Sequence, residues 1–204
     1  YLSDGTEVAA NVPRFEQGKF GKAVLVEEGT TNLYCRHYST YSCSIVNEAS
    51  DFHHTVQLGT DTYSHLLHSN VVVSGDVITL SYEMRVIQGT SVQAIGYLRT
   101  TDNVVNTYLS HTSEDIVEVG EDWTKVSMTV DLSSTNKELM HLSWLVKNPT
   151  GQIVEVRNIQ LEQKAYPTTF TDGTRVAETL TIPTAGVLNP QEGTVEFWWM
   201  PLSG

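Results

Sequence analysis

The sequence has few cysteines and no long apolar run. Its 204 residues include only two cysteines, Cys35 and Cys43. A disulfide framework needs more than two, so we interpret this pair as free or locally joined thiols. No stretch approaches the roughly 20 apolar residues of a transmembrane helix, which argues against a membrane-spanning chain.

Basic residues are also scarce. Lys and Arg number 12 against 24 Asp and Glu, which gives a formal net charge of −12. A surface of that sign repels phosphate backbones and anionic lipids, so we expect no nucleic acid and no membrane among the partners. Carboxylate oxygens suit divalent cations such as calcium better. We expect most of these carboxylates to be solvated surface.

Sequence patterns of common active sites are missing. The chain has no Gly-x-Ser-x-Gly nucleophile, no phosphate-binding glycine loop and no His-Glu-x-x-His metal motif. Five of the seven histidines lie in the first half without the ligand spacing of a zinc site: His37, His53, His54, His65 and His68. We therefore expect no catalysis and interpret these histidines as loop residues.

What the sequence does contain is alternation of apolar and polar residues. Residues 76–87 alternate strictly, as expected of a half-buried strand whose side chains point to opposite faces in turn. Similar segments follow at 92–99, 104–110, 123–132, 139–147 and 153–162. Turns separate the segments and none is convincingly helical. The pattern predicts an all-β antiparallel β-sandwich of the jelly-roll type.

Two segments depart from this pattern. Residues 31–70 are rich in Tyr, His, Ser and Thr with little periodicity, which predicts a first strand and long irregular loops. In the last strand the apolar phase changes at Arg157 and Asn158, since Val156 precedes the change and Ile159 follows it. An inserted residue is the usual cause, so we predict a β-bulge there.

The domain organisation follows from the stop signals after this strand. Tyr-Pro and Asp-Gly pairs end it, and a new apolar alternation begins near residue 195. We predict a lead-in segment at 1–29, a jelly-roll domain at 30–170, and a linker with the truncated start of a second β module at 171–204. Trp144 shares the apolar phase of its strand, which predicts a place in the core.

Several segments resemble known families. Residues 14–33 (RFEQGKFGKAVLVEEGTTNL), 79–85 and 156–175 resemble carbohydrate-binding modules of the family four/nine type in phage and prophage tail or fibre proteins. Residues 193–201 are similar to the start of laminin-G or concanavalin-like lectin domains. The resemblance implies a non-catalytic recognition module of a virion assembled in the bacterial cytoplasm. Its implied partners are a bacterial cell-surface glycan and other tail or fibre subunits, including further copies of itself.

A saccharide site on such a module needs aromatic faces for the sugar rings and polar groups for the hydroxyls. The strand residues on the outward phase are therefore its candidates. Their alternative interpretation is an ordinary solvent-facing set held by cross-strand pairs. The saccharide-binding candidates are Tyr97, Arg99, Tyr108, Glu83, Arg85 and His141.

The resemblance also implies a structural calcium ion between the first and the closing strands. Glu28, Thr30 and Asn158 match its ligand positions. This chain has Arg157 beside Asn158 where the family often has paired aspartates, and a lost carboxylate with a nearby cation weakens a calcium site. The alternative is that Asn158 serves only the backbone of the bulge.

Two other functions stay open at this point. The chain could be a structural spacer or assembly element that holds neighbouring modules in register. It could also be the accessory module of a secreted, extracellular glycoside hydrolase, which needs a catalytic domain elsewhere in the parent protein. A similar fold does not discriminate between these functions, because one fold supports many functions.

Overall fold

The computed structural model describes most of the chain between residues 12 and 181. The described residues are 6, 8–9, 12–18, 21–34, 38–71, 76–101, 108–112, 116–133, 136–181, 191 and 196. Only the backbone is described at 18, 38–39, 66–71, 99–101, 108–112 and 136–143. The chain divides into two units, Thr30–Arg175 on the one hand and Tyr1–Gly29 with Val176–Gly204 on the other.

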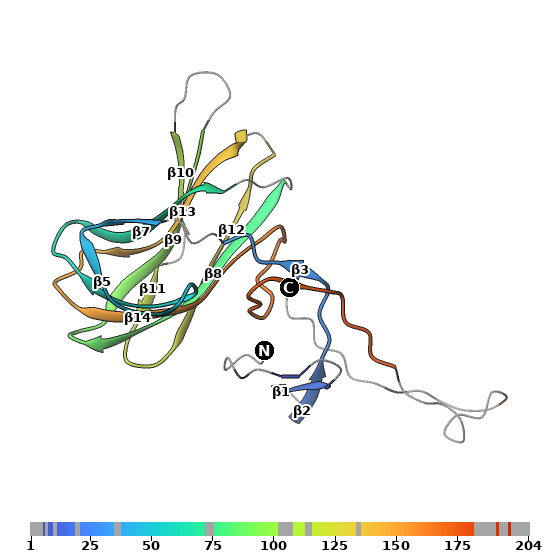
Figure 1. Ribbon diagram of the computed structural model, residues 1–204. Coiled ribbons are helices and arrows are strands. Elements are labelled where there is room, and N and C mark those ends of the chain that lie inside the picture. Colours follow the sequence, from blue (N-terminus) through green and yellow to red (C-terminus); the bar gives the residue numbers. More distant parts are fainter. Residues whose placement is uncertain are drawn as a thin grey trace. The chain divides into compact units, whose positions relative to one another are not determined.

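Unit Thr30–Arg175 is a sandwich of two antiparallel sheets (Figure 1). One sheet has the order β10-β9-β13-β7-β4, with β11 also paired to β9. Its strands are β4 (Tyr38–Tyr41), β7 (Tyr63–Val71), β9 (Val92–Thr101), β10 (Tyr108–Thr112), β11 (Val117–Val119) and β13 (Asn136–Lys147). We call it the six-stranded sheet.

The facing sheet has the order β12-β8-β14-β6-β5. Its strands are β5 (Cys43–Ser50), β6 (His53–Leu58), β8 (Val77–Gln88), β12 (Thr124–Asp131) and β14 (Ile153–Glu162). The short strands β3 (Thr30–Thr31) and β15 (Thr174–Arg175) pair with each other, so the first and the last residues of this unit lie side by side. The predicted all-β antiparallel sandwich is confirmed. Within the described residues, no helix has the length and apolar character needed to cross a membrane.

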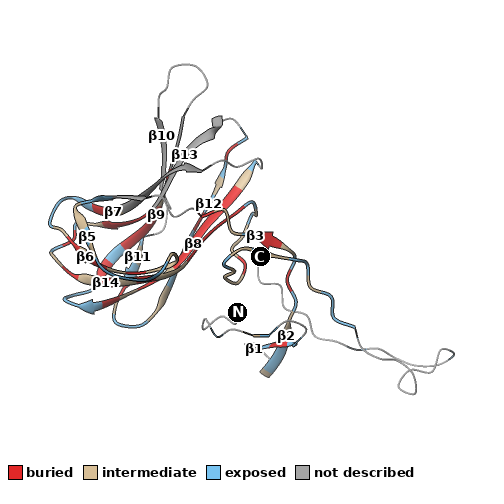
Figure 2. Ribbon diagram, in the orientation of Figure 1, coloured by how far each residue is buried: buried red, intermediate tan, exposed pale blue. Residues whose placement is uncertain are grey.

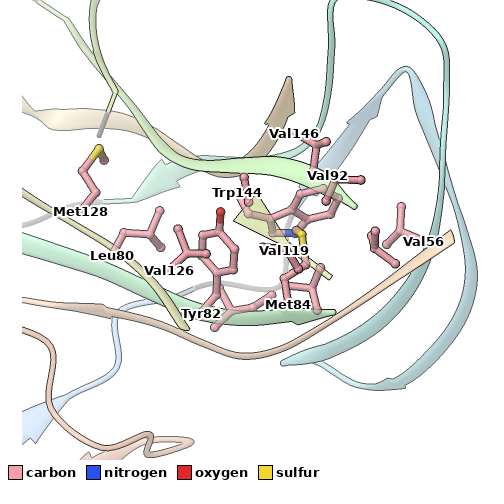
Figure 3. Close-up of a cluster of buried hydrophobic side chains, with 14 of the residues drawn as sticks. Val56, Leu80, Tyr82, Met84, Val92, Val119, Val126, Met128, Trp144 and Val146 are labelled. Carbon is pink, nitrogen blue, oxygen red and sulfur yellow. The ribbon is translucent and has the colours of Figure 1, made fainter. Parts of the chain in front are cut away.

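The core lies between the two sheets, because the period of two places apolar side chains there. Buried residues along β8 and β9 are red in Figure 2. Trp144 of β13 is 1% exposed, which confirms its predicted burial. It packs in one cluster with the β8 residues Tyr82 and Met84 (Figure 3). The Tyr82 hydroxyl crosses the core and donates a 2.9 Å hydrogen bond to the Ile95 carbonyl of β9. The facing sheets are thus joined through a side chain as well as by packing.

Gly96 of β9 makes room for this core. It lies opposite Trp144 in the register of β9 and β13. A Cβ atom at Gly96 would lie 2.7 Å from the Cβ of Met128, which belongs to β12 in the facing sheet. Real Cβ atoms do not approach so closely, so the sheets keep their separation only with glycine at this position.

The expectation of loops across residues 31–70 was wrong, since β4, β5, β6 and β7 lie there. Polar residues at inward positions hid the alternation. In β6 the inward positions are His54, Val56 and Leu58, all buried, and in β7 the buried Ser64 lies inward. A pattern that scores only apolar side chains does not recognise such strands.

A tight corner takes the chain from the six-stranded sheet to the facing one. Ser42 lies between β4 and β5 with a φ of 47°, in the left-handed region. Its carbonyl accepts hydrogen bonds from the Gly59 amide at 2.7 Å and from the Ser64 hydroxyl. These bonds hold a backbone conformation that serine rarely adopts, and they fix the position of the preceding residue, Tyr41.

The predicted bulge in the closing strand is confirmed. The register of β14 against β8 shifts between Arg157 and Gln160, and Asn158 has a φ of 53°. Asparagine tolerates this left-handed conformation better than most residues. After the bulge, Ile159 and Leu161 face the core.

The second unit is described around a hairpin of β1 (Arg14–Gly18) and β2 (Gly21–Leu25). The buried Arg14 guanidinium pairs with Glu27 at 2.8 Å and with Glu178. The Glu178 amide donates to the Glu27 carbonyl at 2.9 Å. Segments from both ends of the chain therefore meet in this unit. The apolar alternation near residue 195 lies outside the described residues, and the predicted domain limits stay a prediction.

Gly96→Ala tests the core spacing. We expect the free energy of unfolding to fall by about 1–3 kcal/mol, because the added methyl group overpacks the contact with Met128. Urea denaturation measures it. The matched control is Gly120→Ala, where an added Cβ meets nothing within 4 Å. Equal stability of the two variants would contradict the assignment of Gly96 as a spacing residue.

His54 should make the stability fall in mild acid. Burial lowers the pKa of its imidazole below the usual value, against the raising effects of Glu48 and Asp51. A lowered histidine pKa gives stability that is complete above the unfolded pKa of about 6.5 and is lost as the pH falls below it. We expect His54→Gln to reduce the slope of unfolding free energy between about pH 7 and 5, measured by urea denaturation. An unchanged slope would show that His54 is not responsible.

Candidate functional site

The two outer faces of the sandwich differ in chemistry. On the outer face of β8 and β14, ion pairs link the strands. Arg85 bonds Glu155 at 2.6 Å, and Arg157 bonds Glu83 at 2.7 Å. Arg85 of β8 lies opposite Glu155 of β14, and Glu83 of β8 lies opposite Arg157 of β14. Each strand thus contributes one cation and one anion. Opposite charges in such cross-strand positions stabilise a sheet.

Trp123, just before β12, contacts both arginines. The guanidinium carbon of Arg157 lies 3.9 Å from the Trp123 ring centroid, and that of Arg85 lies at 4.7 Å. His53 meets the same ring edge-on, with centroids 6.1 Å apart. A planar guanidinium stacks well on an indole, so the Trp123 ring is in contact with side chains of the protein itself. This face fits the alternative interpretation of Glu83 and Arg85 as cross-strand stabilisers.

Two of the three expected calcium ligands have different hydrogen-bond partners in the structure. The Asn158 amide donates to Glu83 at 3.1 Å, whereas the Thr30 hydroxyl donates to Glu162 at 2.8 Å. Glu162 lies opposite Thr79 of β8, four residues from Glu83, or about 13 Å along a strand. Glu28 belongs to the other unit. Among the described residues no group of three or more His, Cys, Asp or Glu could hold a metal, so calcium stays a prediction from the resemblance.

The buried Glu162 carboxylate accepts several hydrogen bonds. Besides the Thr30 hydroxyl, it accepts from the Thr168 amide at 2.9 Å and from the Thr168 hydroxyl. Neighbouring Gln160 accepts from the Thr171 amide at 2.7 Å. These bonds fasten the segment after β14 over the end of the sheet. A buried carboxylate with several donors is stable without a cation.

On the outer face of the six-stranded sheet, three aromatic rings form a ladder. The Tyr41 ring of β4 and the His65 ring of β7 are stacked, with centroids 5.1 Å apart and planes 14° apart. The Tyr97 ring of β9 lies 6.2 Å from His65 at 20°. Tyr41 is 53% exposed, so the ladder reaches the surface at the sheet edge. We call these three residues the aromatic ladder.

The ladder covers two apolar residues on the outward phase. Leu145 of β13 lies opposite both His65 and Ile95 in the strand register. Leu145 is 4% exposed and Ile95 is 2% exposed. β7 and β9 lie on either side of β13, so they are two inter-strand spacings, or about 9.6 Å, apart. The His65 and Tyr97 ring centroids are only 6.2 Å apart, so the two rings lean toward each other over β13. Covered leucine and isoleucine thus support the rings from below.

A polar row runs beside the ladder. Lys147 of β13 lies opposite Tyr63 of β7 and Gln93 of β9, and Gln93 lies opposite Glu118 of β11. The Ser91 hydroxyl donates to the Glu118 carboxylate. Tyr63 is exposed. This face therefore offers aromatic rings next to donors and acceptors, the combination that a sugar ring requires.

The expected saccharide platform is divided between the sheets. Tyr97 belongs to the ladder, whereas Glu83 and Arg85 lie on the opposite outer face. Arg99 lies opposite His141 of β13, two residues from Tyr97. Tyr108 of β10 lies opposite Thr101. The side chains of Arg99, Tyr108 and His141 lie outside the described part.

Sequence reasoning missed Tyr41 and His65 because the composition of residues 31–70 indicates loops. His65 lies in a strand, not in a loop as expected. One signal could have identified His65. Tyr63 and His65 are two residues apart, which is the spacing of side chains on one face of a strand. No such spacing identifies Tyr41, because the chain leaves its sheet at Ser42. Cys43 is a free thiol, whereas Cys35 lies outside the described residues.

Comparison with known proteins shows the fold. No family model matches the chain, and no curated protein matches it. The structure is similar to the CBM22-1 xylan-binding domain of Xyn10C from Paenibacillus barcinonensis, at a TM-score of 0.52 and 10% identity over 69% of this chain and 97% of that one. It is also similar to the CBM22-1–CBM22-2 tandem of the same protein, at 0.51 and 9% identity over 67% and 46%.

Asn158 provides a test of the bulge. Asn158→Gly should leave the free energy of unfolding nearly unchanged, because glycine adopts a φ of 53° without strain. Asn158→Val should lower it by about 1–3 kcal/mol, because a β-branched residue is strained there. Thermal and urea unfolding of both variants measure the difference. If glycine destabilises as much as valine, the amide bond to Glu83 matters more than the backbone.

Proposed function

We propose that unit Thr30–Arg175 is a non-catalytic saccharide-binding module whose ligand lies on the outer face of the six-stranded sheet. The aromatic ladder is the observation that carries this proposal. Tyr41 and Tyr97 offer apolar ring surface to the faces of pyranose rings. The neighbouring polar row supplies groups for the sugar hydroxyls.

Each part of the face has a distinct role in this proposal. Tyr41, at the sheet edge, is the most exposed ring of the ladder and provides the stacking surface. Gln93 and Lys147 lie in the adjacent row, where an amide and an ammonium group can donate to hydroxyl oxygens. Leu145 and Ile95 hold the rings in place, which limits the ordering cost of binding.

The ligand class and the parent protein belong to the same proposal. The similar structures are named as a xylan-binding domain and a tandem that contains it, which supports a polysaccharide ligand. The sequence resemblance supports a phage or prophage tail or fibre protein, with a bacterial cell-surface glycan and other tail subunits as partners. An accessory module of a secreted glycoside hydrolase is the alternative parent that the same fold serves.

A second candidate function is a spacer within a larger assembly. It is favoured by the buried Arg14 pairs with Glu27 and Glu178, which bring both ends of the chain into one unit. The sandwich is thus placed between two segments of that unit in sequence. A spacer requires no ligand on the aromatic ladder, so saccharide binding discriminates between the two functions.

Substitution of the ladder tyrosines tests the saccharide proposal. We expect the wild type to bind on a glycan array or to host cell walls, and Tyr41→Ala and Tyr97→Ala to weaken binding about tenfold or more. Loss of roughly 1.4 kcal/mol of aromatic contact produces that change. Isothermal titration calorimetry with the best array glycan measures it.

The matched control is Ile87→Ala, an exposed residue at the end of β8 in the facing sheet. It should bind as the wild type does. Absence of binding by the wild type, or equal binding by both ladder variants and the control, would contradict the proposal. Unfolding curves of all variants exclude a general loss of structure.

A further inference from the structure

The central ring of the aromatic ladder is an imidazole, which can change its charge near neutral pH. His65 lies between Tyr41 and Tyr97, with near-parallel planes on both sides. Its backbone carbonyl accepts a hydrogen bond from the Cys43 thiol at 3.3 Å. The His65 backbone is therefore tied to β5 of the facing sheet, while its ring contacts the two tyrosines.

The environment of this imidazole suits the neutral form. Its Nδ1 atom is buried and has no hydrogen-bond partner among the described residues. A neutral imidazole can leave one nitrogen unprotonated, but the imidazolium carries a proton and a shared positive charge on both nitrogens. A buried N–H without an acceptor is costly, and more so when charged.

The described neighbours offer no carboxylate to compensate that charge. Beside His65, the titratable side chains described on β4, β7, β9 and β13 of this face are Tyr41, Tyr63, Tyr97 and Lys147, and the Cys43 thiol comes from β5 of the facing sheet. Lys147 would repel an imidazolium.

In the described part of this face, Glu118 of β11 is a carboxylate, and it lies three strands from β7 in the sheet order. It accepts from Ser91.

Two effects oppose each other when His65 is protonated. The faces of two tyrosines attract a cation, which favours the charged ring. Removal of the ring from water disfavours it, and burial is the cause that lowers the pKa of His65 below its usual value. The lowered pKa and the Nδ1 atom without a partner both favour the neutral imidazole while the ladder keeps its present geometry.

We propose that the aromatic ladder is a proton-sensitive device, in which the three rings stay stacked only while His65 is neutral. Acidification places a proton on Nδ1, and the imidazolium turns toward water to solvate it. Tyr41 and Tyr97 then lose their common neighbour. If the face binds saccharide as proposed above, on which this consequence rests, the affinity falls in mild acid by up to about tenfold for each pH unit below the pKa.

NMR of the protein without ligand tests the device itself. The His65→Phe variant identifies the His65 resonance among the seven histidines and is the matched control, since phenylalanine stacks but does not titrate. We expect a His65 pKa below about 6.5. Ring-to-ring nuclear Overhauser contacts from His65 to Tyr41 and Tyr97 should vanish over the same pH range, while the phenylalanine ring of the variant keeps its contacts. Contacts that survive protonation, or an ordinary pKa, would overturn the proposal.

Calorimetry at about pH 7.5 and 5 tests the consequence for binding. The wild type should lose affinity on acidification, whereas His65→Phe should bind equally at both values. The same loss in both proteins, or no loss in either, overturns the link between His65 and binding. Absence of binding at both values contradicts the proposed function alone, because the NMR contacts decide the device without any saccharide.

Discussion

The hydrogen bond from the Tyr82 hydroxyl to the Ile95 carbonyl fixes how the two sheets face each other. Burial raises the pKa of Tyr82 far above its usual value, so the hydroxyl stays a neutral donor inside the core. The bond holds β9 at one position over β8. Gly96 then faces Met128 across the core, and Ile95 and Tyr97 are left on the outer face. The aromatic ladder depends on this placement.

The outer faces of the two sheets carry different kinds of side chain. On the face of β8 and β14, Glu83 and Glu155 pair with the two arginines that stack on Trp123. These charged side chains therefore bond to one another. The face of the six-stranded sheet is covered by rings that lie over apolar residues and reach solvent at Tyr41. Exposed aromatic surface beside polar side chains is the kind of surface on which a ligand gains the most binding free energy.

The sequence predicts the second half of the sandwich well and the first half poorly. The strict alternation of 76–87 predicts β8, and the phase change at Asn158 predicts the bulge of β14, because apolar side chains there follow the period of two. In β6 and β7 the buried His54 and Ser64 interrupt that pattern, so the sequence there indicates loops. Burial of a polar residue depends on partners from distant strands, which a local pattern does not contain.

The candidate site shows the same limit. Tyr97 can be predicted because its strand alternates clearly, whereas its neighbours in the ladder come from β4 and β7. Strand order alone separates Glu83 and Arg85 from Tyr97, and order is a tertiary property. The most direct test is NMR mapping of backbone amide shifts during titration with a glycan selected on an array. Shifts confined to β4, β7, β9 and β13 are the predicted result. Shifts centred on β8 and β14, or none at any glycan concentration, would contradict the assignment of the binding face.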